Sequence, residues 1–148
     1  MANWLRRIFL VFTLLGTPFF YVPLAVVLAT FNFAAAVKLA IILVAAEAFC
    51  GILKFIYPKE RPVPMPRKTF YQKYEAGSFP SIHSARIAAV TTFFSLQYPH
   101  TATIVVGVLA SLIVGYSRVY LRKHYITDVI AGILIGTING IGLGMIFP

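Results

Sequence analysis

The chain contains several apolar segments that are long enough to cross a lipid bilayer, and short turns separate most of them. About 20 apolar residues span the hydrocarbon core as a helix. Hydrophobic residues make up 59% of the 148 residues and charged residues only 11%, whereas about 25% of a soluble domain is charged. The sequence therefore predicts an all-α, integral-membrane helical bundle with about five transmembrane helices. We expect these helices near residues 8–31, 34–57, 80–98, 101–121 and 124–147.

One polar segment, residues 58–79, interrupts the apolar sequence, and we expect it to form a long loop on the active-site side. No repeat or second composition boundary is visible, so residues 1–148 are interpreted as a single membrane-embedded domain. Near the N-terminus, Arg6 and Arg7 precede an apolar run, as in a signal peptide. That run continues to about Phe31 without a clear small-residue cleavage site, which favours a retained first helix.

The distribution of charge indicates which side of the membrane the loop faces. Five antiparallel helices would place the N-terminus, the loop and the turn near residue 122 on one side. Of the 13 Lys and Arg residues, only Lys38 falls near the other side, so the positive-inside rule predicts that the active-site face is cytoplasmic. Some of these cations suit a phosphate site in any case, but the remaining ones favour the same orientation.

The net charge of +9 does not have the pattern of a nucleic-acid-binding protein, because the basic residues gather at helix ends. The expected partners are the membrane and a lipid phosphate substrate, with no nucleic acid and no obligate protein partner. The single cysteine, Cys50, excludes an internal disulfide and leaves the redox compartment undetermined.

Residues 117–128, with the sequence SRVYLRKHYITD, have the clearest catalytic pattern. His124 and Asp128 are four residues apart and therefore share one face of a helix. A carboxylate in that position can hold the proton of one ring nitrogen, which leaves the other nitrogen free to attack phosphorus. The alternative is a polar start to the last helix, with Asp128 as a first-turn acid favoured by the helix dipole.

Lys54, Arg61 and Arg118 lie at or just beyond predicted helix ends on the loop side. Guanidinium groups match the geometry of phosphate oxygens, and lysine supplies a compact positive charge. The alternative for each residue is that its long side chain reaches for the membrane surface, as most Lys and Arg at helix ends do. Lys59 is expected to remain in solvent.

The segment PSIHS, residues 80–84, carries a second histidine. Pro80 suits the first turn of a helix, and the free N–H groups of residues 81–84 would then point at a nearby anion. His83 in that turn could protonate a leaving oxygen. Taken alone, the segment is more typical of a proline-started helix that a histidine merely caps.

Together, the patterns KxxxxxxRP, PSxH and SRxxxxxHxxxD occur in this order between Lys54 and Asp128, about half of the chain. They resemble the three signature motifs of the type 2 phosphatidic acid phosphatase family, which also includes vanadium haloperoxidases. The resemblance implies a phosphatase that needs no metal ion and no other cofactor. The acidic residues number only 4 and form no ligand cluster in the sequence, which agrees with that implication.

The resemblance also implies a role for each matching residue. His124 would be the nucleophile that becomes phosphohistidine, His83 the general acid, and Asp128 the residue that orients His124. The implied phosphate-binding residues are Lys54, Arg61, Ser81, Ile82 and Arg118. Two features depart from the family pattern. Ile82 stands where glycine is usual, and about five helices are expected where many membrane members have six.

Two charged residues lie within predicted helices but outside the motifs: Glu47 in the second helix and Arg86 in the third. A charge inside a membrane span is costly and is usually paired. We therefore expect Glu47 and Arg86 to form a buried ion pair behind the active site.

Glycine recurs at every fourth position of the last helix, at residues 132, 136, 140 and 144. Small residues in this spacing let helices approach closely, and packing within the chain is favoured over dimerisation. Such a row drifts around the helix by about 40° per step, so it is not expected to face one partner over its full length.

The leading functional interpretation is a membrane phosphatase that removes phosphate from an isoprenoid phosphate or diphosphate, or from a glycerolipid phosphate. A lipid phosphotransferase, in which a lipid hydroxyl replaces the attacking water, is not separated from it by the sequence. A haloperoxidase is disfavoured because members of that branch are soluble. A non-enzymatic anion-binding or lipid-binding protein is disfavoured because binding alone needs no nucleophile.

Overall fold

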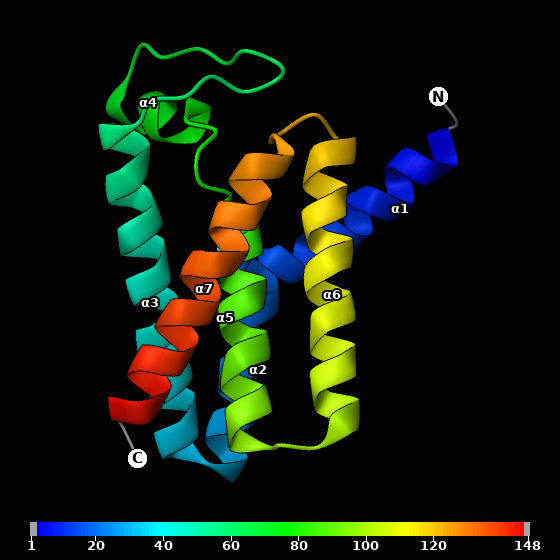
Figure 1. The fold of residues 1–148 in the computed structure, drawn as a ribbon, viewed down its shortest axis with the longest axis vertical. Helices are drawn as coiled ribbons and strands as arrows, with labels where there is room; N and C mark the ends of the chain where they lie inside the picture. Colours follow the sequence, from blue (N-terminus) through cyan, green and yellow to red (C-terminus); the bar gives the residue numbers. More distant parts are fainter. Residues whose placement is uncertain (1–2, 147–148) are drawn as a thin grey trace.

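The computed structural model describes residues 3–146 as a bundle of helices, with the long loop and the connection at residues 121–125 at the same end (Figure 1). Three helices are individually long and apolar enough to cross a membrane, and a bent pair forms a fourth candidate span. The predicted all-α membrane bundle is therefore confirmed, although the number of unbroken spans is smaller than expected. The helices in chain order are α1 (Asn3–Thr13), η1 (Leu14–Gly16), α2 (Pro18–Phe31), α3 (Phe33–Ile56), α4 (Phe70–Ala76), α5 (Ile82–Gln97), α6 (Thr101–Tyr120) and α7 (Ile126–Ile146).

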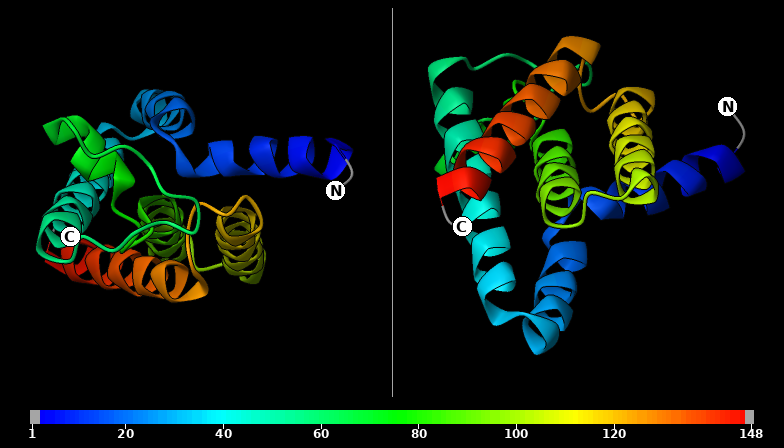
Figure 2. Two further views of the ribbon diagram at one scale, coloured as in Figure 1. Left: turned by 90° about the horizontal axis from the view of Figure 1, so that it is seen from above. Right: turned by 60° about the horizontal axis from the view of Figure 1, so that its bottom comes forward.

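The first predicted span, residues 8–31, is not one straight helix. Its two parts meet at an angle of 47°, and α1 leaves the bundle sideways while α2 runs along it (Figure 2). The break has a local cause, because Pro18 is the first residue of α2 and Thr17 before it is extended, with φ −112° and ψ 159°. The helical region is disfavoured for a residue that precedes proline, and the extended Thr17 interrupts the helix at this point.

The α5 helix is the central element of the bundle and is shorter than its neighbours. It has 16 residues, so it is about 24 Å long, less than the ~30 Å hydrocarbon core. Its N-terminus lies deeper in the bundle than the adjacent ends of α3, α6 and α7 (Figure 1). The polar segment before α5 therefore descends into the bundle and brings the PSIHS residues to the base of a recess.

The glycines of α7 allow it to pack closely against α5. A Cβ atom added at Gly132 would lie 2.3 Å from Ser81 O, and one added at Gly136 would lie 2.0 Å from Ala85 O. Packing within the chain is thus confirmed for these residues. The expectation that the row would not face one partner is wrong, since Gly140 and Gly144 also meet α5 side chains. The two helices cross at an angle (Figure 1), and rows at four-residue spacing are themselves inclined to the helix axis.

The long loop is partly ordered by a short helix, α4, that the sequence analysis missed. Thr69 and Gln72 form a reciprocal capping box at its start. Phe70 stacks on Phe55 of α3, with ring centroids 4.8 Å apart. Arg67 fixes the start of the loop by donating hydrogen bonds to the carbonyl oxygens of Pro58, at 3.0 Å, and Lys59, at 3.2 Å. The loop therefore has a defined path over the recess.

Candidate active site

His124 lies in the connection between α6 and α7, where its side chain is only 2% exposed. Its Nδ1 atom is 2.7 Å from the carbonyl oxygen of Ser78. A carbonyl oxygen can only accept, so Nδ1 carries the proton and Nε2 keeps its lone pair. Burial lowers the pKa of His124 to about 4, and the nearby cations Arg118 and Arg61 act in the same direction. The imidazole is therefore neutral near pH 7 and has a nucleophilic nitrogen.

Asp128 is fully buried in the first turn of α7, whereas His124 precedes that helix, so the expectation that the two residues share one helical face is wrong. Its Oδ2 atom is 3.8 Å from Nδ1 of His124, which is too long for a hydrogen bond. The same carboxylate accepts hydrogen bonds from the Ser78 hydroxyl and from the Tyr125 N–H group at 2.9 Å. Asp128 thus reaches His124 through Ser78, whose carbonyl group holds the ring, rather than by the direct bond expected from the i, i+4 spacing.

Lys59 is only partly exposed and its ammonium group is paired, whereas the sequence led us to expect it in solvent. Its ammonium group lies 2.6 Å from Oδ1 of Asp128 and 3.0 Å from the hydroxyl of Thr127. It also sits over the ring of Tyr125, 4.5 Å from the centroid. The backbone of the loop holds Lys59 in this position, because the Lys59 carbonyl accepts a hydrogen bond of 2.8 Å from the Ser78 N–H group. A single backbone contact therefore ties Lys59 to the residue that holds His124.

The cations Lys54 and Arg61 are fixed by backbone carbonyl groups. Lys54, at the end of α3, is buried and donates to the carbonyl oxygen of Gly77. Arg61 donates from Nε to Glu75 O at 2.9 Å and from Nη1 to Lys123 O at 3.2 Å. Burial lowers the pKa of Arg61 from its ordinary value. Since neither cation pairs with a carboxylate in the described residues, both retain positive charge for an anion.

Arg118 lies near the end of α6 and is buried. Its Nη1 atom donates a hydrogen bond of 2.9 Å to the hydroxyl of Thr13 in α1. Its Nε atom is buried and has no hydrogen-bond partner in the part of the chain that the structure describes. Buried polar groups normally have partners, so this donor is available for an acceptor that enters the site.

The start of α5 contributes residues of the second motif. Ser81 caps the helix, because its hydroxyl accepts hydrogen bonds from the hydroxyl of Ser84 at 3.0 Å and from the Ser84 N–H group at 3.5 Å. The Ser81 N–H group donates to Asp128 O at 2.9 Å, which ties α5 to α7. The Ile82 side chain packs with Cys50 and Ala85, so much of it is turned toward the core.

These residues surround a cavity of about 380 Å³. Of the eight predicted site residues, five line its wall: Lys54, Arg61, Ile82, His83 and His124. The other three, Ser81, Arg118 and Asp128, are buried residues outside the lining. The close approach of η1 to the site depends on Gly16, since a Cβ atom there would lie 2.8 Å from Cβ of His83.

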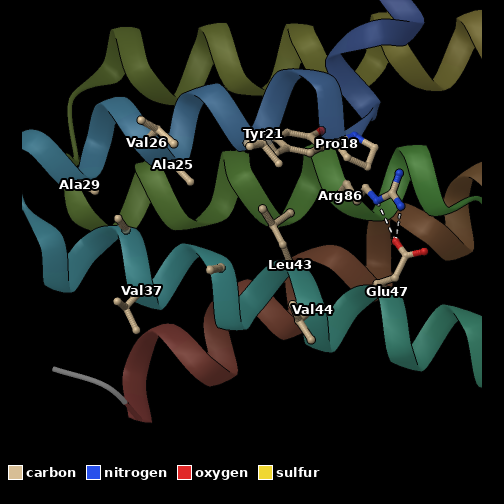
Figure 3. A pocket seen from close by; sticks show the side chains of 13 residues that line it. Pro18, Tyr21, Ala25, Val26, Ala29, Val37, Leu43, Val44, Glu47 and Arg86 are labelled. Atoms are coloured by element: carbon tan, nitrogen blue, oxygen red, sulfur yellow. Dashed lines mark hydrogen bonds and ion pairs between the residues drawn. The ribbon is translucent and has the colours of Figure 1, made fainter.

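The Glu47–Arg86 ion pair is confirmed, but its position differs from the prediction. Arg86 donates to Glu47 from Nε, at 2.8 Å, and from Nη2 (Figure 3). Both residues line the cavity, and the Glu47 side chain is 35% exposed. The pair is therefore part of the cavity wall and not a buried pair behind it. Tyr74 of α4, which the sequence analysis missed, donates its hydroxyl to the other Glu47 oxygen.

Within residues 3–146, no group of three or more His, Cys, Asp and Glu side chains is arranged to hold a metal ion. The cavity instead brings together two histidines and several cations at one end of a membrane bundle. This combination is typical of one class of protein, a membrane-embedded enzyme that acts on phosphate esters.

Comparison with known proteins agrees with that class. The family model of the PAP2 superfamily matches residues 35–145, and the chain belongs to this superfamily. It is accordingly a phosphatase of the lipid phosphate type.

Two solved structures share the fold. A transmembrane PAP2-type phosphatidylglycerolphosphate phosphatase from Bacillus subtilis is 23% identical, with a TM-score of 0.79 over 99% of this chain and 78% of that one. LpxE from Aquifex aeolicus is 24% identical, with a TM-score of 0.81 over 99% of this chain and 88% of that one.

Proposed function

We propose that this protein hydrolyses lipid phosphates through a covalent phosphohistidine at His124, without a metal ion. The observation that carries the proposal is the hydrogen bond of 2.7 Å between Nδ1 of His124 and Ser78 O. It directs the lone pair of Nε2 away from Ser78, on a ring that lines a cavity with Lys54 and Arg61. A pure binding site for anions has no need of a neutral histidine held in this tautomer.

The proposed reaction has two steps. Nε2 of His124 attacks phosphorus, the bond to the lipid oxygen breaks, and protonated His83 gives its proton to that oxygen. The arriving phosphate dianion favours the protonated form of His83. In the second step, neutral His83 takes a proton from water, which attacks the phosphohistidine and releases inorganic phosphate. Both histidines then return to their starting protonation states.

The proposed role of the cations is to stabilise the negative charge of the phosphate group in the transition state. Lys54 and Arg61 line the cavity, and the buried Nε donor of Arg118 has no hydrogen-bond partner among residues 3–146. The N–H groups of Ile82 and His83, in the first turn of α5, have no intrahelical acceptor and are further donors for the phosphate oxygens. Fixed donors of this kind stabilise a transition state because they need no reorganisation during the reaction.

The substrate is proposed to be an isoprenoid phosphate or diphosphate, or a glycerolipid phosphate. A phosphotransferase would use the same first step and replace water by a lipid hydroxyl. The decisive experiment measures inorganic phosphate released by the purified protein from a panel of lipid phosphates, with His124→Ala as the control. We expect release by the wild type and none by the variant. Equal release by both proteins would reject the mechanism, and a phosphorylated lipid product without phosphate release would identify a phosphotransferase.

The active-site face is proposed to be cytoplasmic. Lys38 is the one basic residue near the opposite end of the bundle among 13 Lys and Arg residues. A cysteine introduced at Lys68, in the exposed loop, tests this orientation in a Cys50→Ala background. An impermeant thiol reagent should label it only after the cells are opened, and labelling of intact cells would overturn the assignment.

A further inference from the structure

An apolar groove of about 530 Å³ runs between α2 and α3 and ends at the Glu47–Arg86 pair (Figure 3). Its walls are side chains between Pro18 and Ala29 of α2 and between Ala36 and Glu47 of α3. The 12 residues from Ala36 to Glu47 extend about 16 Å along the helix, close to the ~15 Å thickness of one leaflet. The groove therefore has the length and character to hold a hydrocarbon chain.

The groove and the catalytic cavity adjoin each other. Pro18, Glu47 and Arg86 line both of them, so the ion pair forms the neck between the two spaces. A lipid phosphate with its chain in the groove and its phosphorus beside His124 must pass this neck. In a monophosphate, the atoms at the neck are the ester oxygen and the first carbons. In a diphosphate, the phosphate attached to the chain would lie there instead.

The neck carries no surplus positive charge. Nε and Nη2 of Arg86 both donate to Glu47, and its Nη1 atom donates to Gly16 O at 3.2 Å. The second oxygen of Glu47 accepts from the Tyr74 hydroxyl. The ring centroid of Tyr74 also lies 5.8 Å from the ammonium nitrogen of Lys54. A second acid, Glu75, lines the cavity as well.

We propose that Glu47 is a specificity-determining residue that favours lipid monophosphates over diphosphates. This inference rests on the proposed function and concerns the same cavity. The additional phosphate of a diphosphate would meet a carboxylate whose charge cancels that of Arg86, and three of the five N–H groups of that guanidinium already donate to Glu47 and Gly16. A monophosphate brings no charge to this position and is unaffected.

The test is a double-mutant cycle at Glu47 and Arg86 in the purified full-length protein. Initial rates of phosphate release are compared for matched pairs that share a chain: farnesyl phosphate with farnesyl diphosphate, and phosphatidic acid with diacylglycerol diphosphate. We expect the wild type to favour the monophosphate about tenfold in kcat/KM, or about 1.4 kcal/mol. Glu47→Gln leaves Arg86 uncompensated and should raise the diphosphate-to-monophosphate ratio about tenfold. Arg86→Gln should lower the ratio, and the double variant should restore it.

Glu60→Gln removes an acid outside the cavity and is the matched control, for which an unchanged ratio is expected. If Glu47→Gln fails to fold, the comparison of Arg86→Gln with the wild type gives the same test with the opposite sign. A wild type that cleaves both members of a pair equally, or an unchanged ratio in folded Glu47→Gln, would overturn the inference and leave the phosphatase proposal intact. A wild type that cleaves no lipid phosphate of either kind would overturn both.

Discussion

The ammonium nitrogen of Lys59 lies 2.6 Å from Oδ1 of Asp128, although the two residues are separated by 69 positions in the chain. Asp128 is completely buried, and its other oxygen accepts the hydroxyl hydrogen of Ser78, the residue whose carbonyl group holds His124. Lys59 thus compensates a buried carboxylate that supports the nucleophile. We interpret Lys59 as a positioning residue, since it does not line the catalytic cavity.

Lys59→Met should therefore lower kcat about tenfold and change KM little. A charge-assisted hydrogen bond contributes about 1.5–3 kcal/mol, and this value is discounted here because the Lys59 side chain is 39% exposed. Lys59→Arg keeps the positive charge and should recover most of the rate. Lys68→Met, at an exposed lysine of the same loop, is the control. A Lys59→Met enzyme with wild-type kcat would show that the contact has no role in catalysis.

The ion pair of Glu47 and Arg86 predicts a specific pattern of stability. Glu47→Gln and Arg86→Met each leave one charge without its partner, and each should cost about 1–2 kcal/mol, less than for a buried pair because Glu47 is 35% exposed. The double variant removes both charges and should be more stable than either single variant. Thermal unfolding in one detergent measures all four proteins, and strictly additive losses would contradict a coupled pair.

Much of the architecture could be predicted because it follows from long apolar segments and their spacing. The helices α3, α6 and α7 lie within a few residues of their predicted bounds. Counting antiparallel helices was also sufficient to predict that His83 and His124 lie at the same end of the bundle, and both line one cavity. The break before Pro18 was missed because proline also occurs inside a membrane helix, as Pro23 does in α2.

The support of the site was harder to predict, because it depends on the path of the loop. The ring of His124 is held by a backbone carbonyl group, that of Ser78, and any residue would supply the same group. The position of Lys59 follows from the contacts of Arg67 with the loop backbone. Neither contact has a signature in sequence spacing, so Lys59 looked like an ordinary solvent-exposed lysine.

The protonation of His124 gives a prediction about pH. Burial lowers its pKa to about 4, below the ~6.5 of an unperturbed histidine. The ring should stay neutral as the pH falls through 6.5 and gain a proton only near pH 4. Between these values the unfolded chain binds a proton that the folded protein does not, so this group lowers stability as the pH decreases. Titration of ¹⁵N-labelled histidine by NMR, assigned with His124→Ala, measures the pKa, and a transition near 6.5 would contradict burial of a neutral ring.

The chemistry of the cavity predicts how inhibitors act. Vanadate can adopt the five-coordinate geometry of the transition state beside a histidine, and transition-state analogues bind more tightly than substrates. We expect vanadate to inhibit phosphate release and EDTA to leave it unchanged, because residues 3–146 offer no cluster of metal ligands. Inhibition by EDTA that added magnesium reverses would be inconsistent with a metal-free reaction.

The central claim, a covalent phosphate on His124, is tested most directly by trapping the phosphoenzyme. Purified protein is mixed with a ³²P-labelled lipid phosphate and quenched in alkaline detergent, in which phosphohistidine survives, and the labelled peptide is identified by mass spectrometry. We predict label on His124 in the wild type, weaker label with a small residual rate in Asp128→Asn, and neither label nor turnover in His124→Ala. Label on another residue, or full turnover by His124→Ala, would contradict the account.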